Sequence, residues 1–187
     1  MQAVLSRRRF TADDYHRMVD AGILSARERV ELIDGEVVAM TPIGPQHNAC
    51  VDRANRAFVT SVGDKAIVRV QGSVRLSYYR EPQPDLVLLR PQPDFYASAL
   101  PGPADILLIV EIAESSVEYD RDVKGRMYAD SGVPEYWLVD LNEKVLSCYS
   151  KPEGGTYQNV RNYRQGQSVS PELLPAHSIG AAVLLGD

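Results

Sequence analysis

The chain has 187 residues, of which 44% are hydrophobic and 24% charged, with 20 Lys and Arg against 25 Asp and Glu. This length fits a single domain over residues 1–187, and the average charged fraction argues against bulk disorder. The net charge of −5 argues against a protein whose whole surface coats nucleic acid, but it does not exclude a local basic groove.

The N-terminal part of the chain predicts two helices and a hairpin after a flexible tail. The predicted elements are a tail over residues 1–9, a helix over 11–21, strands near 29–33 and 36–40, and a helix over 46–62. Thr11 followed by acidic residues marks the first helix start. Asp34-Gly35 between two β-prone runs is a strong hairpin signal. His47 lies on the apolar, core-facing stripe of the second helix.

The rest of the chain is rich in predicted strands. The expected elements are strands at 66–70, 73–79, 86–89, 106–112, 135–141, 145–149 and around 156–163, a loop at 90–104, a helix over roughly 117–131, and an edge strand or loop over 169–184. The alternating runs 66–70 and 73–79 are expected to pair with each other. The most hydrophobic run, 106–112, is expected to be the central strand. The helix between two buried strands resembles a crossover unit. The sequence therefore predicts an α/β domain with a mixed central β-sheet flanked by helices, and with an N-terminal helix and β-hairpin.

The remaining composition indicates a cytoplasmic protein. Cys50 and Cys148 are too few for a disulfide framework or a zinc cluster, so we expect two buried, reduced thiols. No stretch is long and apolar enough to span a membrane, and the first residues lack the apolar run of a signal peptide.

Three acidic residues lie where a charge is costly. Asp85 directly precedes the apolar run 86–89, Glu111 interrupts the most apolar strand, and Glu31 lies inside the hairpin pattern. A carboxylate in a buried strand needs a cation, a proton or several hydrogen bonds. If Asp85 and Glu111 lie on neighbouring strands, their oxygens could converge, and such hard ligands suit Mg²⁺ or Mn²⁺.

Each acid also has a plainer interpretation. Glu111 could pair with an arginine of an adjacent strand. Asp85 could be a turn residue after a proline, and Glu31 could face solvent from a half-exposed hairpin. The spacing of the acids alone leaves these alternatives open.

The predicted third helix carries a candidate cation for this site. Asp120, Lys124 and Tyr128 are four residues apart and therefore share one helix face. Lys124 could approach the end of the strand that carries Glu111. The alternative is an ordinary surface pair between Asp120 and Lys124.

Several motifs in this order carry a family resemblance. They are Glu31-Leu-Ile-Asp-Gly-Glu36, Gln83-Pro-Asp85, Val110-Glu-Ile112, Asp120-Arg-Asp-Val-Lys124 and Gly132-Val-Pro-Glu-Tyr-Trp-Leu-Val-Asp140. From about residue 10 to the C-terminus, the chain resembles the restriction-endonuclease-like family, a bacterial group expanded in cyanobacteria. That family belongs to the PD-(D/E)xK phosphodiesterase superfamily. The ordered combination is specific for the family and much less specific for an activity.

The resemblance implies a metal held at the edge of the sheet. It makes Asp85 the first acid of the motif, Glu111 the second, and Glu31 an additional upstream acid. The superfamily expects a lysine two positions after the second acid, where this chain has Ala113. Lys124 on the neighbouring helix is the candidate for its replacement.

The implied activity is that of a Mg²⁺-dependent endonuclease that hydrolyses phosphodiester bonds in DNA, with Mn²⁺ as a substitute. Asp85, Glu111 and Glu31 would hold the metal together with the backbone carbonyl of Ile112, and Lys124 would orient the attacking water. A homodimer is expected, because two sites related by a twofold axis can cut both strands of a duplex.

Accessory roles and other functions remain open in the sequence. His47, Gln83 and Asp120 are candidates for accessory roles, with a structural histidine as the alternative for His47. Ala113 favours a second hypothesis, a catalytically inactive nuclease-fold protein that acts as a binding or assembly module. A third hypothesis is a protein unrelated to nucleic acid, in which the acids form structural salt bridges.

Overall fold

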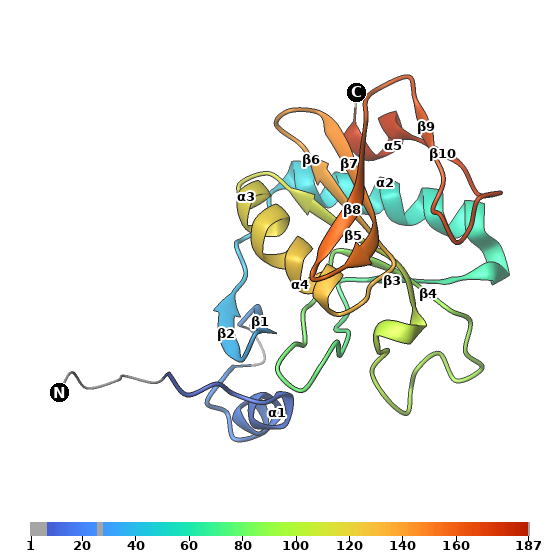
Figure 1. Ribbon diagram of the computed structural model, residues 1–187. Helices are drawn as coiled ribbons and strands as arrows, with labels where there is room; N and C mark the ends of the chain where they lie inside the picture. The colour runs from blue at the N-terminus through green and yellow to red at the C-terminus, as the bar shows by residue number, and fades with distance from the viewer. Residues whose placement is uncertain (1–6, 26–27, 187) are drawn as a thin grey trace.

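The computed structural model describes residues 7–25 and 28–186 and has a six-stranded sheet at its centre (Figure 1). The strand order is β3-β4-β5-β6-β7-β8. These strands are β3 (Ile67–Val70), β4 (Leu86–Leu89), β5 (Ile106–Ala113), β6 (Glu135–Asp140), β7 (Val145–Glu153) and β8 (Thr156–Tyr163). β5 and β6 pair in parallel and the other neighbours are antiparallel, so the predicted mixed sheet is confirmed.

Helices cover both faces of this sheet, and each face has its own hydrophobic core. α2 (Pro45–Val62) and α5 (Ala181–Leu185) pack on one face together with Leu108, Val110 and Ile112 of β5. α4 (Gly125–Asp130) packs on the other face together with Ile109 and Ala113. Because side chains alternate along a strand, Glu111 points to the same face as Ile109 and Ala113. The most apolar strand thus presents its one acid to the α4 side.

The predicted crossover helix forms, but it is not a regular α-helix. It consists of α3 (Val117–Tyr119), a π-helical turn η3 (Asp120–Lys124), and α4. The Gly125 N–H donates to the carbonyl of Asp120, five residues back, which is the π-helical pattern. Gly125 also lies against Tyr136 of β6, where an added Cβ would be 3.4 Å from the ring.

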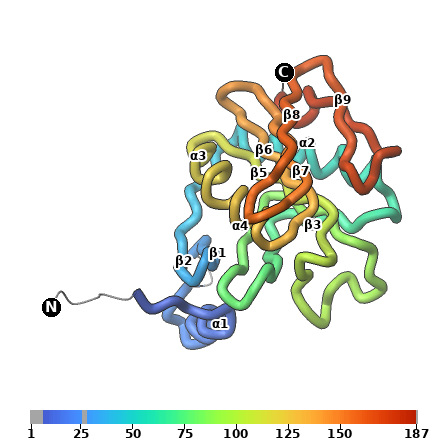
Figure 2. Tube along the Cα trace, in the orientation of Figure 1, coloured from blue at the N-terminus to red at the C-terminus, as the bar shows by residue number. Residues whose placement is uncertain are grey.

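The hairpin and the first helix lie together at one end of the molecule, as the tube in Figure 2 also shows. α1 (Ala12–Asp20) begins at Thr11, whose hydroxyl accepts from the Asp14 N–H in a capping box. β1 (Val30–Ile33) and β2 (Glu36–Ala39) are joined by Asp34 and Gly35, both with positive φ. These angles are those of a type I′ hairpin turn, so the predicted hairpin is confirmed.

Only part of the expected N-terminal tail can be compared with the structure, because residues 1–6 lie outside the described part of the chain. Within residues 7–9, Arg9 Nε donates to the Asp34 carbonyl at 2.7 Å. The tail therefore meets the hairpin turn at this point.

The strand predicted at 73–79 is wrong. β3 pairs with β4, and segment 73–79 instead makes single hydrogen bonds, such as Val74 N–H to the Pro82 carbonyl. Its alternating pattern arises because Val74 and Leu76 are buried in the core on the α4 face. Alternation reports burial on one side of an extended segment and does not by itself require a partner strand.

The interpretation of 169–184 as only edge strand or loop is also wrong. β9 (Ser168–Val169) and β10 (Ile179–Gly180) form a small two-stranded sheet, but residues 181–185 form helix α5. Ala181, Leu184 and Leu185 of α5 are buried against the core on the α2 face. A helix of five residues is too short to show helical periodicity in the sequence.

The two cysteines are free and buried, as expected, and burial raises the pKa of Cys50 to about 11. None of the helices in the described part of the chain combines the length and the apolar composition needed to cross a bilayer.

Candidate functional site

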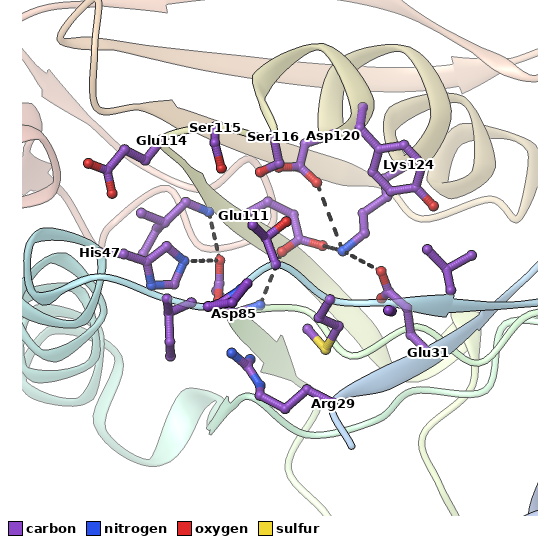
Figure 3. A pocket seen from close by; sticks show the side chains of 18 of the residues that line it. Arg29, Glu31, His47, Asp85, Glu111, Glu114, Ser115, Ser116, Asp120 and Lys124 are labelled. Atoms are coloured by element: carbon purple, nitrogen blue, oxygen red, sulfur yellow. Dashed lines mark hydrogen bonds and ion pairs between the residues drawn. The ribbon is translucent and has the colours of Figure 1, made fainter. Parts of the chain in front are cut away.

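A cavity of about 320 Å³ lies where the first turn of α2, the hairpin and the segment after β5 meet (Figure 3). Its ionisable lining residues are Arg29, Glu31, His47, Asp85, Glu111, Glu114, Tyr119, Asp120 and Lys124. These residues come from segments that are far apart in the chain.

Sheet register brings Asp85 and Glu111 together. Leu86 of β4 is paired with Val110 of β5, so the next antiparallel position places Asp85 opposite Glu111. The Asp85 N–H donates to Glu111 Oε2 at 3.2 Å, and the Ile112 N–H donates to Asp85 Oδ2 at 2.9 Å. Both acids are buried, with relative exposures of 7% and 3%. The condition set by the sequence, that these acids lie on neighbouring strands and face one spot, is met.

Lys124 lies among three carboxylates. Its Nζ is 3.0 Å from Glu111 Oε1, 3.1 Å from Glu31 Oε1 and 3.9 Å from Asp120 Oδ1. Tyr128, one turn further along the helix, donates its hydroxyl to Glu111 Oε1 at 2.6 Å. Lys124 is 5% exposed, so the alternative of an ordinary surface pair does not describe it.

The charges in the cavity do not balance. Burial raises the pKa of Glu111 to about 8, and burial raises the pKa of Asp120 to about 6. Burial also lowers the pKa of Lys124, but the surrounding carboxylates outweigh this effect and raise it. Lys124 therefore remains a cation, and the buried acids outnumber it. Extra positive charge or bound protons would stabilise such a site.

His47 approaches the site from the other side, from the first turn of α2. Its Nε2 lies 3.1 Å from Asp85 Oδ2, and the side chain is 8% exposed. Burial lowers its pKa, but hydrogen bonding and attraction to Asp85 raise it overall. Its Nδ1 is buried and has no hydrogen-bond partner in the described part of the chain. One ring nitrogen thus holds Asp85, while the other is enclosed beside the cavity without a hydrogen-bond partner among the described residues.

The structure gathers most of the predicted site residues. Glu31, His47, Asp85, Glu111, Ile112, Asp120 and Lys124 all line the cavity. Gln83 is not among the lining residues, and its backbone N–H donates to Glu31 Oε2 at 3.2 Å. The catalytic and metal-binding roles of these residues stay predictions.

Sequence reasoning missed Arg29. It lies two residues before Glu31, and residues at that spacing in an extended segment point to the same side. This spacing is the signal that could have found it once Glu31 was placed in the site.

The oxygen atoms of the site fit a hard divalent cation by type. Mg²⁺ is commonly bound by one or two carboxylates together with waters and substrate phosphates. Asp85 and Glu111 supply the carboxylates. The N–H of Ile112 points toward Asp85. In a strand, the N–H and the C=O of one residue point to the same side, so the Ile112 carbonyl also faces the side of Asp85. Among the described residues, no three His, Cys, Asp or Glu side chains are already placed to hold a metal ion together.

Comparisons with known proteins give a family and a similar fold. The family model described as "Uma2: Putative restriction endonuclease" matches residues 12–183. The fold is similar to the crystal structure described as "a putative nuclease belonging to DUF820" from Anabaena variabilis, with a TM-score of 0.74 over 94% of this chain and 97% of that chain. The two chains are 14% identical, so this likeness shows the fold alone. A comparison with curated proteins finds no match.

Proposed function

Because the chain belongs to the Uma2 family, described as "Putative restriction endonuclease", we propose that it is a metal-dependent endonuclease that hydrolyses phosphodiester bonds in DNA. The observation that carries the proposal is the meeting of Asp85 and Glu111 in one buried cavity beside Lys124. This arrangement of acids and a lysine suits phosphoryl chemistry, which depends on positioning and on electrostatic stabilisation.

Asp85 and Glu111 would hold Mg²⁺, or Mn²⁺ in its place, with the Ile112 carbonyl and Glu31 as further oxygen donors. Such an ion supplies positive charge for the phosphate and makes a water more acidic. The protein fixes both acids beforehand through N–H groups of the backbone, from Ile112 to Asp85 and from Asp85 to Glu111.

Lys124 would orient the attacking water and neutralise charge that develops on the phosphate. An ammonium group has three donors. Two of them are used within 3.1 Å, by Glu111 and Glu31, and Asp120 lies further away at 3.9 Å. One donor therefore remains for a water in the cavity. Two residues of the same helix position these groups. Asp120 lies beside Lys124, and Tyr128 donates a hydrogen bond to Glu111.

Ala113 favours a second candidate, an inactive nuclease-fold protein that binds or assembles with a partner. The position at which the superfamily expects a lysine is a fully buried alanine in the core on the α4 face. In this case the ion pairs of Lys124 would serve stability alone.

Cleavage of supercoiled plasmid DNA with Mg²⁺ or Mn²⁺ tests the proposal. We expect the wild-type chain to cut the plasmid, and we expect Asp85→Ala and Glu111→Ala each to lose at least about a hundredfold in rate. Asp52→Ala removes an exposed acid of α2 and should cut like the wild type. The ratio of linear to nicked product reports whether both strands are cut together, as the predicted homodimer would do.

Two outcomes would contradict the proposal. Unchanged cutting by either Asp85→Ala or Glu111→Ala would remove these acids from the reaction. A folded wild-type chain that does not cut with either ion would favour the inactive binding module.

A further inference from the structure

The cavity contains a second cationic side chain, which differs from Lys124 in its burial and in its ion pairs. Lys124 is buried and is surrounded by the carboxylates described above. Arg29 also lines the cavity, is only half-buried, and makes no ion pair among residues 7–25 and 28–186. Its Nη1 is buried and has no hydrogen-bond partner there.

The position of Arg29 is held by the hairpin. Its backbone carbonyl accepts from the Met40 N–H at 2.8 Å, so Arg29 is anchored directly before β1. Figure 3 shows its side chain reaching into the cavity with the guanidinium toward Asp85. No dashed line joins the two groups, whereas His47 and Ile112 both contact the Asp85 carboxylate.

We infer that Arg29 binds a phosphate group of the DNA strand at this cavity. This inference rests on the proposed function and identifies what recognises its substrate. A guanidinium offers five N–H donors in a planar fork that matches phosphate oxygens. A buried N–H without a partner costs free energy, and a turn of the guanidinium toward a bound phosphate oxygen would give this N–H a partner.

The acidic residues of the cavity explain why a cation is needed to bind a phosphate there. Ionised acids among Glu31, Asp85 and Asp120 repel a phosphodiester, and Glu111 adds to this repulsion when it loses its proton. The charge of Lys124 is already directed at three of the four acids, Glu31, Glu111 and Asp120. Arg29 is the remaining Lys or Arg side chain among the cavity's lining residues. It can attract the backbone to the acids without giving up an existing ion pair.

DNA binding measured apart from cleavage tests this role. A short fluorescent DNA duplex is titrated with protein at several salt concentrations, with EDTA present so that the DNA stays intact. We expect Arg29→Met to bind about tenfold more weakly than the wild type or worse, which matches the loss of one charge-assisted contact. The slope of log K against log salt should fall by about one, as expected for one lost phosphate contact.

Two further variants separate a specific contact from net charge and from folding. Arg161→Met removes an exposed arginine of β8, which does not line the cavity, and should keep the wild-type affinity and slope. Arg29→Lys keeps the charge but loses the fork, so its affinity should lie between those of the wild type and Arg29→Met. Thermal unfolding of each variant shows whether a loss of binding reflects a loss of folded protein.

The outcomes distinguish this inference from the proposed function. If the wild type binds and cuts DNA while Arg29→Met binds with unchanged affinity and slope, the inference is wrong and the nuclease proposal stands. If Arg29→Met and Arg161→Met weaken binding equally, the effect is one of net charge and the inference is also wrong. If the wild type neither binds nor cuts DNA, both fail.

Discussion

A single lysine illustrates how much the site depends on individual side chains. Lys124 lies within 3.1 Å of both Glu111 and Glu31, which belong to different parts of the fold. Removing one partner of a buried ion pair leaves the other charge without compensation. The free-energy cost of this loss exceeds the net stability that the pair contributes. Lys124 therefore has a structural role that can be measured independently of any catalysis.

Lys124→Met keeps most of the aliphatic stem and removes the charge. We expect it to lower the free energy of unfolding by about 3–5 kcal/mol at pH 8. The loss should be smaller at pH 5, because the remaining acids, of which Glu111 already has a raised pKa, can then bind protons. Urea titrations at the two pH values measure this difference.

Lys65→Met is the matched control, since Lys65 is exposed in the short helix after α2. Its effect should stay within about 0.5 kcal/mol. A loss for Lys124→Met that is equally small, or that does not change with pH, would show that the lysine does not neutralise these acids.

At the scale of elements, two irregular segments position the site. The π-helical turn carries both Asp120 and Lys124, which are buried, and Lys124 contacts Glu111 and Glu31. π-helical turns are rare and often occur at functional sites. The tight hairpin turn at Asp34 and Gly35 sets the register that directs the side chain of Glu31, with 3% exposure, toward the cavity.

Gly35→Ala tests how strongly the site depends on this hairpin. Gly35 has a φ of +83°, and an added Cβ would lie 2.7 Å from the Cβ of Arg9, close to the backbone of that residue. We expect the free energy of unfolding to fall by roughly 2–3 kcal/mol, from backbone strain and from the displaced Arg9.

Gly22→Ala is a control with similar backbone strain but free space. Gly22 has a φ of +70° and nothing within 4 Å of an added Cβ, so it should cost only about 1 kcal/mol. Urea unfolding compares the two. Equal losses would mean that the contact with Arg9 adds nothing to the strain of the turn.

At the scale of the whole molecule, the site is a junction of distant segments. α2 brings His47, the hairpin brings Glu31, the sheet brings Asp85 and Glu111, and the crossover helix brings Lys124. A cation that binds these carboxylates would therefore connect the hairpin with two strands of the central sheet. Such a ligand stabilises the native state by mass action, since the unfolded chain does not form the site.

We expect Mg²⁺ to raise the midpoint of thermal unfolding, by roughly 5–10 °C at a concentration about a hundred times its Kd. The shift should be larger at pH 8 than at pH 6, because the ion needs ionised carboxylates and burial raises the pKa of Glu111 to about 8. Without the ion, a rise in pH lowers the contribution of Glu111 to stability. The raised pKa means that the folded state holds a proton that the unfolded chain has released, so the contribution of Glu111 to stability falls as pH rises from 4.5 to about 8.

Glu111→Gln should lose most of the Mg²⁺-induced shift, and Asp52→Ala should retain it. Thermal unfolding with Mg²⁺ and with EDTA, at both pH values, measures these effects. A shift of equal size in Glu111→Gln, or none in the wild type, would contradict a metal site at this cavity.

The sequence by itself determined most of the elements and identified the unusual acidic residues, whereas the strand predicted at 73–79 was wrong and helix α5 was missed. Local signals such as the cap at Thr11, the turn at Asp34-Gly35 and the apolar run of β5 depend on neighbouring residues only, so they predicted the helices, the hairpin and the central strand. The same local reasoning identified Asp85 and Glu111 as costly charges in apolar surroundings.

Only the tertiary structure decided which charges meet. The register of β4 against β5 placed Asp85 beside Glu111, and the π-helical turn placed Lys124 between Glu111 and Glu31. The sequence shows neither that Arg29 Nη1 has no partner among the described residues nor that a short helix α5 forms. The physical reason is that local patterns specify conformation and burial, whereas the distance between remote side chains depends on the packing of the whole chain.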